Sequence, residues 1–225
     1  MAGEAQKIEI VGVAGSGKST LTRLLESDYG CRVADSLHTR LPAHWPYVAR
    51  GLPRVVPLVV SVRERPLPSW DELKFAVYVA EWDRFLRADR VREGVVVLDQ
   101  GPLFALACLL WGRKPFTRRT RFESWLSQMI ERWSRELDAI VVLDAPDDVL
   151  LARIDAREQG HDAKGVPSHD GFELIGRHRE AYRRVLEPIE NAGAPRLLRY
   201  DTATMAPAQV AAELGETFAL SREQG

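Results

Sequence analysis

The chain of 225 residues is long enough for one α/β domain with a sizeable core, and its charges nearly balance at a formal net charge of -1. This balance gives no argument for a nucleic-acid partner or for an acidic membrane surface, and the longest apolar run, 103–111, is about half the roughly 20 residues of a membrane span. Two cysteines without metal-ligand spacing, and an amino terminus without the apolar core of a signal peptide, favour a reducing, cytoplasmic setting.

The first part of the chain predicts a strand, a glycine turn and a helix in direct succession. Residues 7–13 alternate and are β-branched, as in a strand, and leucines recur at helical spacing after Lys18. The turn between them fits G-x-x-x-x-G-K-[ST], the phosphate-binding P-loop. The residues expected to hold the nucleotide phosphates are Gly12, Ala14, Gly15, Ser16, Gly17, Lys18, Ser19 and Thr20.

The chemistry of a P-loop depends on each of these residue types. Glycines let several backbone N–H groups turn toward one anion, and the start of the helix adds a partial positive charge. We expect Lys18 to reach the β- and γ-phosphates of ATP, and the Ser19 hydroxyl to bind Mg²⁺. The alternative, a glycine turn that binds nothing, is disfavoured by the complete motif in its strand–turn–helix context.

Strands and helices alternate along the rest of the chain, which predicts βαβ units and a parallel sheet covered on both faces. The region 36–69 is rich in proline and arginine and is interpreted as a loop with a short helix or strand. Ser69 and Glu72 form a predicted capping box for the helix that follows. The other predicted strands are 31–34, 95–98, 139–143 and 196–200, and the helices are 70–93, 102–111, 118–137, 147–158, 170–191 and 206–220.

Two strands end in an aspartate that could lie near the bound metal. We prefer Asp99 to Asp144, because Gly101 allows a sharp turn after Asp99 and Gln100 adds a polar group facing the site. Asp144 is followed by Ala-Pro, and a role as a helix N-cap or turn residue is at least as well supported there.

Further polar residues are candidates for the transferred phosphate and for the acceptor. Arg153 and Arg157 share a helix face before the polar loop 159–168. This arrangement suits a lid over 153–170 that closes onto the phosphates. The alternative is that the two arginines only form a solvated basic face. Asp35 follows the second strand and could be a general base, a hydrogen-bond acceptor for substrate, or only a turn residue. The other acceptor-side candidates are Arg40, Arg84 and Gln100.

These residues resemble the nucleoside and nucleotide kinases of the P-loop class, thymidylate kinase-like enzymes in particular. The matching segments are GVAGSGKST, AEWDR before VVVLDQGP, VVLDAPDDVLLARIDAR and the helix RHREAYRRVLE. The resemblance implies a three-layer P-loop NTPase fold within 1–225, a five-stranded parallel sheet of order 2-3-1-4-5 and a helical lid after the fourth strand. It also implies ATP with Mg²⁺ as the phosphate donor, with the adenine near 202–207.

The acceptor side departs from the family pattern. Thymidylate kinases carry Asp-Arg-Tyr or a similar sequence where this chain has Asp99-Gln100-Gly101, so the arginine for the acceptor phosphate is missing. Their Arg-Glu-Pro-Gly-Gly sequence after the second strand is absent, as is the Glu-Arg-Ser of deoxynucleoside kinases after the third. We therefore expect an acceptor other than dTMP: a nucleoside, another nucleotide or a different hydroxyl metabolite.

The resulting hypothesis is an ATP-dependent small-molecule kinase, with a homodimer left open. The alternatives are a kinase for a sugar or an antibiotic, which the insertion at 36–69 leaves open, and an ATP-binding module without catalysis. A GTPase is disfavoured, because the only asparagine, Asn191, lies outside any Asn-Lys-x-Asp motif.

Overall fold

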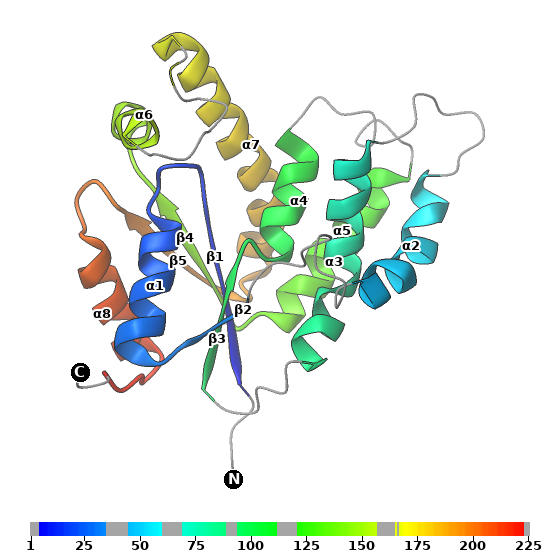
Figure 1. Ribbon diagram of the computed structural model, residues 1–225, viewed down its shortest axis with the longest axis horizontal. Coiled ribbons are helices and arrows are strands. Elements are labelled where there is room, and N and C mark those ends of the chain that lie inside the picture. The colour runs from blue at the N-terminus through cyan, green and yellow to red at the C-terminus, as the bar shows by residue number, and fades with distance from the viewer. Residues whose placement is uncertain are drawn as a thin grey trace.

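A five-stranded parallel sheet forms the centre of the protein (Figure 1). The computed structural model describes residues 5–34, 45–59, 69–88, 94–111, 121–156, 165 and 167–222, without the side chains of 45, 47, 48, 56–59, 71 and 83–88. The strand order is β2-β3-β1-β4-β5 and every pairing is parallel, as the resemblance implied. The strands are β1 (Gln6–Gly12), β2 (Arg32–Ala34), β3 (Val95–Asp99), β4 (Ala139–Asp144) and β5 (Arg196–Asp201).

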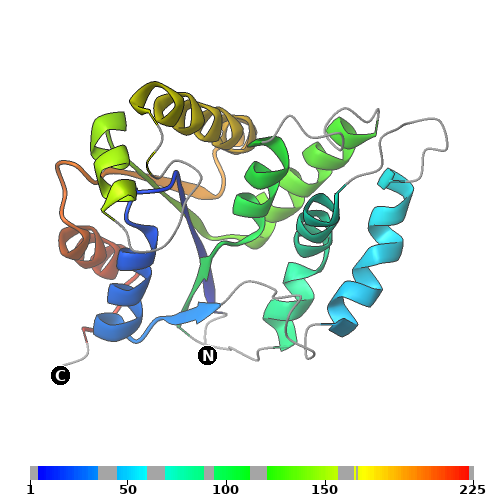
Figure 2. The same ribbon diagram turned by 45° about the horizontal axis from the view of Figure 1, so that its top comes forward.

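Helices cover both faces of this sheet, so the molecule has three layers (Figures 1 and 2). Helices α1 (Lys18–Tyr29) and α8 (Pro207–Thr217) lie together on one face. Helix α4 (Pro102–Trp111) packs between α3 (Trp70–Ala88) and α7 (Ser168–Ala192) on the other face, where α5 (Phe122–Glu136) also contacts α7. The structure also contains α2 (Trp45–Val59) and α6 (Asp147–Asp155).

The central strand β1 separates two hydrophobic cores. Its side chains alternate, with Ile8 and Ile10 packed under α1 and α8 and Val11 packed under α4 and α7. The strand is buried on both faces because parallel strands in such folds are covered by crossover helices. Glu9, on the same face as Val11, is completely buried although it is charged in water.

The observed elements confirm the predicted order and differ at their ends by a few residues. The predicted capping box is present: the Ser69 N–H donates to Glu72 Oε2 at 2.7 Å, and the Glu72 N–H donates to Ser69 Oγ at 3.3 Å. Helix α3 is described as far as Ala88, and the predicted extension to 93 lies outside the described residues.

The region 36–69 contains more regular structure than the sequence suggests. Helix α2 spans 15 residues, where the sequence predicts a loop with one short element. It packs against α3: Gly51 lies against Val77 and Glu81, and Arg54 forms an ion pair with the buried Glu81. Tertiary packing therefore supports a helix whose prolines obscure its sequence pattern. Among the helices described here, none combines the length and the apolar character that a membrane span requires.

Candidate functional site

The P-loop connects the carboxyl end of β1 to the amino end of α1. Gly12 and Gly15 have φ angles of 150° and 85°, and neither position has space for a side chain. A Cβ at Gly12 would lie 2.1 Å from the Leu143 carbonyl oxygen, and one at Gly15 would lie 2.8 Å from the Leu150 carbonyl oxygen. The loop is therefore packed against the end of β4 and against α6, and this packing fixes its path.

Gly17 precedes helix α1 in the left-handed conformation, with a φ of 92°. Helix α1 then starts at Lys18, whose ammonium donates to the Gly12 and Val13 carbonyl oxygens at 2.7 and 2.9 Å. The side chain thus lies over the loop rather than extending into solvent. The N–H groups of the first turn and the lysine charge together favour an anion at this point.

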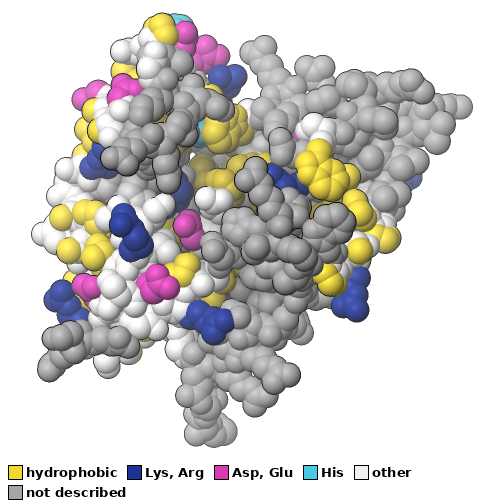
Figure 3. Space-filling model, in the orientation of Figure 1, with side chains coloured by type: hydrophobic (Ala, Val, Ile, Leu, Met, Phe, Trp, Pro, Cys, Tyr) yellow, Lys and Arg dark blue, Asp and Glu magenta, His cyan; other side chains and the backbone are white. Residues whose placement is uncertain are grey.

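A cavity of about 280 Å³ opens directly beside the loop. It lies beyond the carboxyl ends of β1 and β3, where ligands bind in open α/β sheets. Figure 3 shows a hollow with hydrophobic side chains along it in the upper part of this face of the molecule. The structure brings six of the sequence-predicted residues together in its wall: Gly12, Ala14, Lys18, Ser19, Asp99 and Gln100.

The opposite wall of this cavity consists of residues that the sequence reading did not select. Helix α4 contributes Phe104, Cys108 and Trp111, and helix α7 contributes His178 and Tyr182. Trp111 and His178 contact each other through their rings. The cavity therefore has a charged, hydroxyl-bearing side at the P-loop and a largely aromatic side at α4 and α7.

Asp99 ends β3 next to the P-loop strand, with Ile10 as its register partner in β1. Gln100, which follows it, has a positive φ of 54°, an uncommon conformation for a residue other than glycine. Such local strain persists only where the surrounding structure enforces it, and it is frequent at functional sites. The turn from β3 into α4 is thus held in one conformation at the edge of the cavity.

Glu9 lies beneath this turn and is a second feature that the sequence reading missed. Its two carboxyl oxygens accept hydrogen bonds from the N–H groups of Leu103, at 3.1 Å, and Phe104, at 2.9 Å. Burial raises the pKa of Glu9 to about 8, these two hydrogen bonds offset part of the rise, and the charge of Asp99 adds to it. The sequence contains a clear signal for this residue, because a glutamate in a strand that is covered on both faces must be buried.

Tyr182 lies between the P-loop cavity and a second cavity of about 490 Å³ along β4 and α7, and it lines both. Burial raises the pKa of its phenol well above the ordinary value, with nearby Cys108 and Glu9 adding to the rise and a hydrogen bond to the Gly12 backbone opposing it. The phenol is therefore neutral and acts as a rigid wall beside the loop.

Arg153 lies at the base of the predicted lid and contacts the P-loop directly. Its guanidinium donates to the Gly15 carbonyl oxygen at 3.3 Å and to Thr202 Oγ1 and the Thr202 carbonyl oxygen at 2.9 and 2.8 Å. Arg153 thus connects α6 to the loop and to the segment after β5. Its predicted role toward the transferred phosphate stays a prediction.

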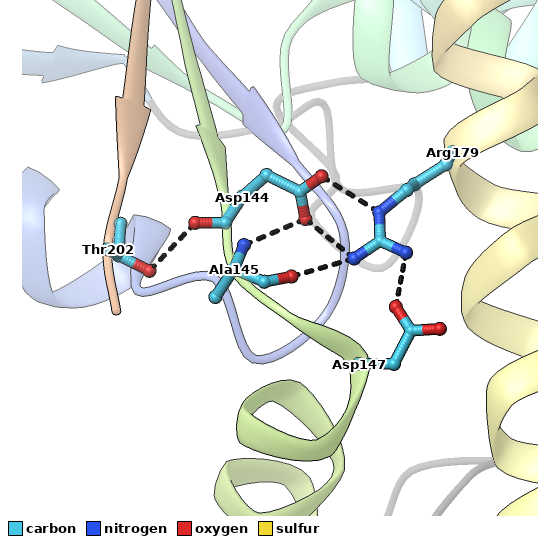
Figure 4. Close-up of polar contacts among 5 residues, drawn as sticks. All are labelled: Asp144, Ala145, Asp147, Arg179 and Thr202. Atoms are coloured by element: carbon cyan, nitrogen blue, oxygen red, sulfur yellow. Dashed lines mark hydrogen bonds and ion pairs between the residues drawn. The ribbon is translucent and has the colours of Figure 1, made fainter. Parts of the chain in front are cut away.

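Asp144, the other strand-end aspartate, forms an ion-pair cluster with α7 (Figure 4). Its carboxylate accepts from Arg179 Nε and Nη2 at 2.8 and 3.2 Å, and Arg179 also pairs with Asp147 at the start of α6. Thr202 donates its N–H to the Asp144 carbonyl oxygen at 2.8 Å. Burial opposes the charge of Arg179, but the hydrogen bonds and charges of the two aspartates outweigh it and raise the arginine pKa. The cluster joins α6, α7 and the ends of β4 and β5.

The remaining candidates lie where the structure gives no side-chain geometry. Asp35, Arg40 and Arg157 are outside the described residues, and Arg84 belongs to α3 without a described side chain. Among the residues that are described, no group of three or more histidine, cysteine, aspartate or glutamate side chains could hold a metal ion. A magnesium ion in a P-loop site is bound by a hydroxyl group and by phosphate oxygens, so it does not require a cluster of histidine, cysteine, aspartate or glutamate side chains.

Comparisons with known proteins identify the fold. No protein-family model matches the sequence, and no curated protein matches it. Among solved structures, thymidylate kinase from Candida albicans aligns over 97% of this chain and 93% of its own, with a TM-score of 0.59 and 14% identity. Deoxyadenosine kinase from M. mycoides with bound dATP covers 94% of this chain and 99% of its own, with a TM-score of 0.56 and 13% identity.

A third solved structure is similar to the same extent. The YorR protein from Bacillus subtilis, in complex with phosphorylated GDP, aligns over 94% of this chain and 95% of its own, with a TM-score of 0.56 and 17% identity. At these identities the likeness shows the fold: the protein has the three-layer architecture of the P-loop nucleoside and nucleotide kinases.

Proposed function

We propose that this protein is an ATP-dependent kinase that transfers the γ-phosphoryl group to a small-molecule acceptor in the cavity beside the P-loop. The observation that supports the proposal is that Lys18, Ser19 and Asp99 line one cavity, so that an ammonium, a hydroxyl and a carboxylate group share the space beside the P-loop. The solved structures that share the fold include kinases of nucleosides and nucleotides, which supports an acceptor of that size.

The donor phosphates bind to the P-loop in this proposal. The backbone N–H groups of the loop and the start of α1 attract the anion, and Lys18 adds a full charge. Ser16 Oγ is buried beside Gly12 and has no hydrogen-bond partner in the described part of the chain, so a phosphate oxygen would satisfy it. The lack of a partner for the Ser16 hydroxyl in the described part of the chain therefore supports a nucleotide bound in the loop.

A magnesium ion fits the donor set at the same place. The Ser19 hydroxyl and the Asp99 carboxylate are hard oxygen ligands on one cavity wall, which is the type of ligand that Mg²⁺ prefers. Bound there, the ion would neutralise phosphate charge during transfer. Asp99 would also order the turn that faces the acceptor.

The acceptor occupies the aromatic side of the cavity, against Phe104, Trp111 and Tyr182. Flat rings in a pocket of this size bind a planar or apolar group by area and stacking. We further propose that Asp35 orients or deprotonates the acceptor hydroxyl, that Arg40, Arg84 and Gln100 contact the acceptor, and that Arg153 with Arg157 neutralises charge in the transition state. A sugar or an antibiotic is the competing acceptor class.

The test is a phosphoryl-transfer assay with radiolabelled ATP and Mg²⁺ over a panel of nucleosides, nucleotides, sugars and aminoglycosides. We expect one acceptor class to be labelled by the wild type, and Lys18→Ala to lose at least about 100-fold in kcat because a preorganised charge on the phosphates is removed. Lys7→Ala is the matched control, since Lys7 pairs with Glu136 at the amino end of β1, away from the loop.

Two results would contradict the proposal. Full activity of Lys18→Ala would show that the loop does not carry the chemistry. Tight ATP binding by the wild type without transfer to any acceptor of the panel would instead identify a nucleotide-binding module.

A further inference from the structure

Glu9 lies in the middle of the central strand and has no solvent exposure. An ionisable side chain in such a place is costly unless the surroundings satisfy it, because burial removes its hydration. Nothing in the phosphate-binding motif explains it, since Glu9 precedes the first glycine of the loop and faces α4. The burial of Glu9 therefore needs an explanation other than the phosphate-binding motif.

In the described part of the chain, both hydrogen bonds of the Glu9 carboxyl group come from the residues that follow Asp99. Oε2 accepts the Leu103 N–H and Oε1 accepts the Phe104 N–H, so both oxygens are used on the first turn of α4. Those N–H groups have no partner within their own helix, and the positive end of the helix dipole lies at the same point. A carboxyl from a neighbouring strand thus takes the part that a local N-cap residue takes in other helices.

Gly101 fits closely over the same carboxyl group. A Cβ at this position would lie 2.7 Å from the Glu9 Cδ and 2.9 Å from each carboxyl oxygen, which is closer than real side chains approach. The absence of a side chain at Gly101 therefore allows the turn to rest on the carboxyl. Gln100, directly before it, is held at a φ of 54°.

We propose that Glu9 is a positioning residue that fixes the Asp99-Gln100-Gly101 turn, and with it the metal-directed carboxylate of Asp99 and the acceptor wall at Phe104. The kinetic part of this inference rests on the proposed kinase function. Glu9 acts through the turn and touches neither ATP nor the acceptor. Its two hydrogen bonds set where α4 begins relative to the P-loop strand.

The substitution Glu9→Gln separates positioning from simple burial. A carboxyl group has an acceptor lone pair on each oxygen in either protonation state, whereas the amide nitrogen of glutamine has none. One of the two α4 N–H groups would then face an NH₂ group, and the turn would shift or loosen. Glu72→Gln is the matched control, because Glu72 is also buried and accepts a backbone N–H at a helix start, yet its helix, α3, lines neither described cavity whereas α4 lines the P-loop cavity.

The first measurement needs no enzymatic activity. Hydrogen–deuterium exchange of the peptide containing 100–104 reports directly on the N–H groups that Glu9 binds. We expect faster exchange there in Glu9→Gln than in the wild type, with unchanged exchange of the P-loop and α1, and no change at 100–104 in Glu72→Gln. Wild-type exchange of this peptide in a folded Glu9→Gln protein would overturn the proposal.

The second measurement is kinetic and separates Glu9 from a general loss of folded protein. Because supporting residues around a metal site typically contribute about 10–100-fold, we expect kcat to fall about tenfold in Glu9→Gln and the required Mg²⁺ concentration to rise. The KM for ATP should stay within about twofold, since the loop itself is intact. Equal kinetics in Glu9→Gln and Glu72→Gln would contradict a positioning role.

The two proposals fail in different ways. If the wild type transfers no phosphate to any acceptor, the proposed function is wrong, and the exchange at 100–104 still decides whether Glu9 fixes the turn. If the wild type is active and Glu9→Gln matches it in both exchange and kinetics, the kinase assignment stands and the role of Glu9 is wrong.

Discussion

The two walls of the P-loop cavity are built in different ways. The phosphate wall, where the donor phosphates bind in the proposed function, belongs to one continuous stretch, 12–20, whose backbone N–H groups would supply most of the contacts. The opposite, aromatic wall is assembled from α4 and α7, which are far apart in the sequence. A site made of backbone groups and local turns is therefore encoded by a sequence motif, whereas a site made of packed side chains is encoded by the fold.

We expect the largest kinetic effect from a substitution at Asp99, which lines the cavity at the end of β3. We expect Asp99→Asn to lower kcat about 100-fold, because loss of a charged ligand weakens the electrostatic stabilisation that a metal supplies, which amounts to several kcal/mol. Steady-state kinetics at saturating ATP and acceptor measure this effect.

Asp144→Asn is the control for this prediction, since Asp144 also ends a strand but is engaged by Arg179. We expect it to lower the free energy of unfolding and to reduce kcat far less than Asp99→Asn does. A larger kcat loss at Asp144 than at Asp99 would reverse the assignment of the metal-directed carboxylate.

The aromatic wall can be tested separately from the phosphate wall at Trp111. Truncation to alanine removes a large half-buried ring from the cavity, and we expect the acceptor KM to rise about tenfold, which corresponds to about 1.4 kcal/mol of binding. The KM for ATP should stay unchanged, because in the proposed function the phosphates bind at the P-loop and not at the aromatic wall.

Trp70→Ala provides the comparison for this test. Trp70 is 60% exposed at the start of α3, so its loss removes a tryptophan without changing the cavity. Equal effects of Trp70→Ala and Trp111→Ala on the acceptor KM, or an effect of Trp111→Ala on ATP alone, would show that the acceptor binds elsewhere.

The sequence predicted the sheet, its connections and the phosphate wall because each depends on local patterns. Buried apolar runs mark β3 and β4, leucine spacing marks α1, and the spacing of the glycines and the lysine marks the loop. These signals lie within a few residues of each other, so no knowledge of the fold is needed to read them.

The aromatic wall and the supporting contacts were not predicted, because they depend on tertiary packing. Trp111 ends the uniformly apolar helix α4 and Tyr182 lies on the buried side of α7, and only the packing of α4 against α7 brings them to one cavity. Likewise, the sequence shows the charges of Asp144 and Arg179 but not their pairing. Glu9 was missed for a different reason. The sequence shows a charged residue inside a predicted buried strand, and such a residue needs a hydrogen-bond or ionic partner.

The last expected effect concerns stability rather than rate, and it is a pH dependence that comes from Glu9. Burial raises the pKa of its carboxyl group from an ordinary 4.5 to about 8 in the folded protein. Between these values the folded chain keeps a proton that the unfolded chain has released, so the free energy of unfolding falls as pH rises through this window. Below about pH 4.5 the contribution is complete, and above about pH 8 it is lost.

Urea unfolding of the wild type and of Glu9→Gln at about pH 5.5, 7 and 8.5 measures this contribution, because the two proteins share every other titratable group. Glutamine has no proton to release, so we expect a flatter curve for the variant and a stability difference that shifts in its favour as pH rises. Parallel curves would mean that the folded and unfolded carboxyl groups titrate alike, and Glu9 would then support the turn as an ordinary carboxylate at every pH.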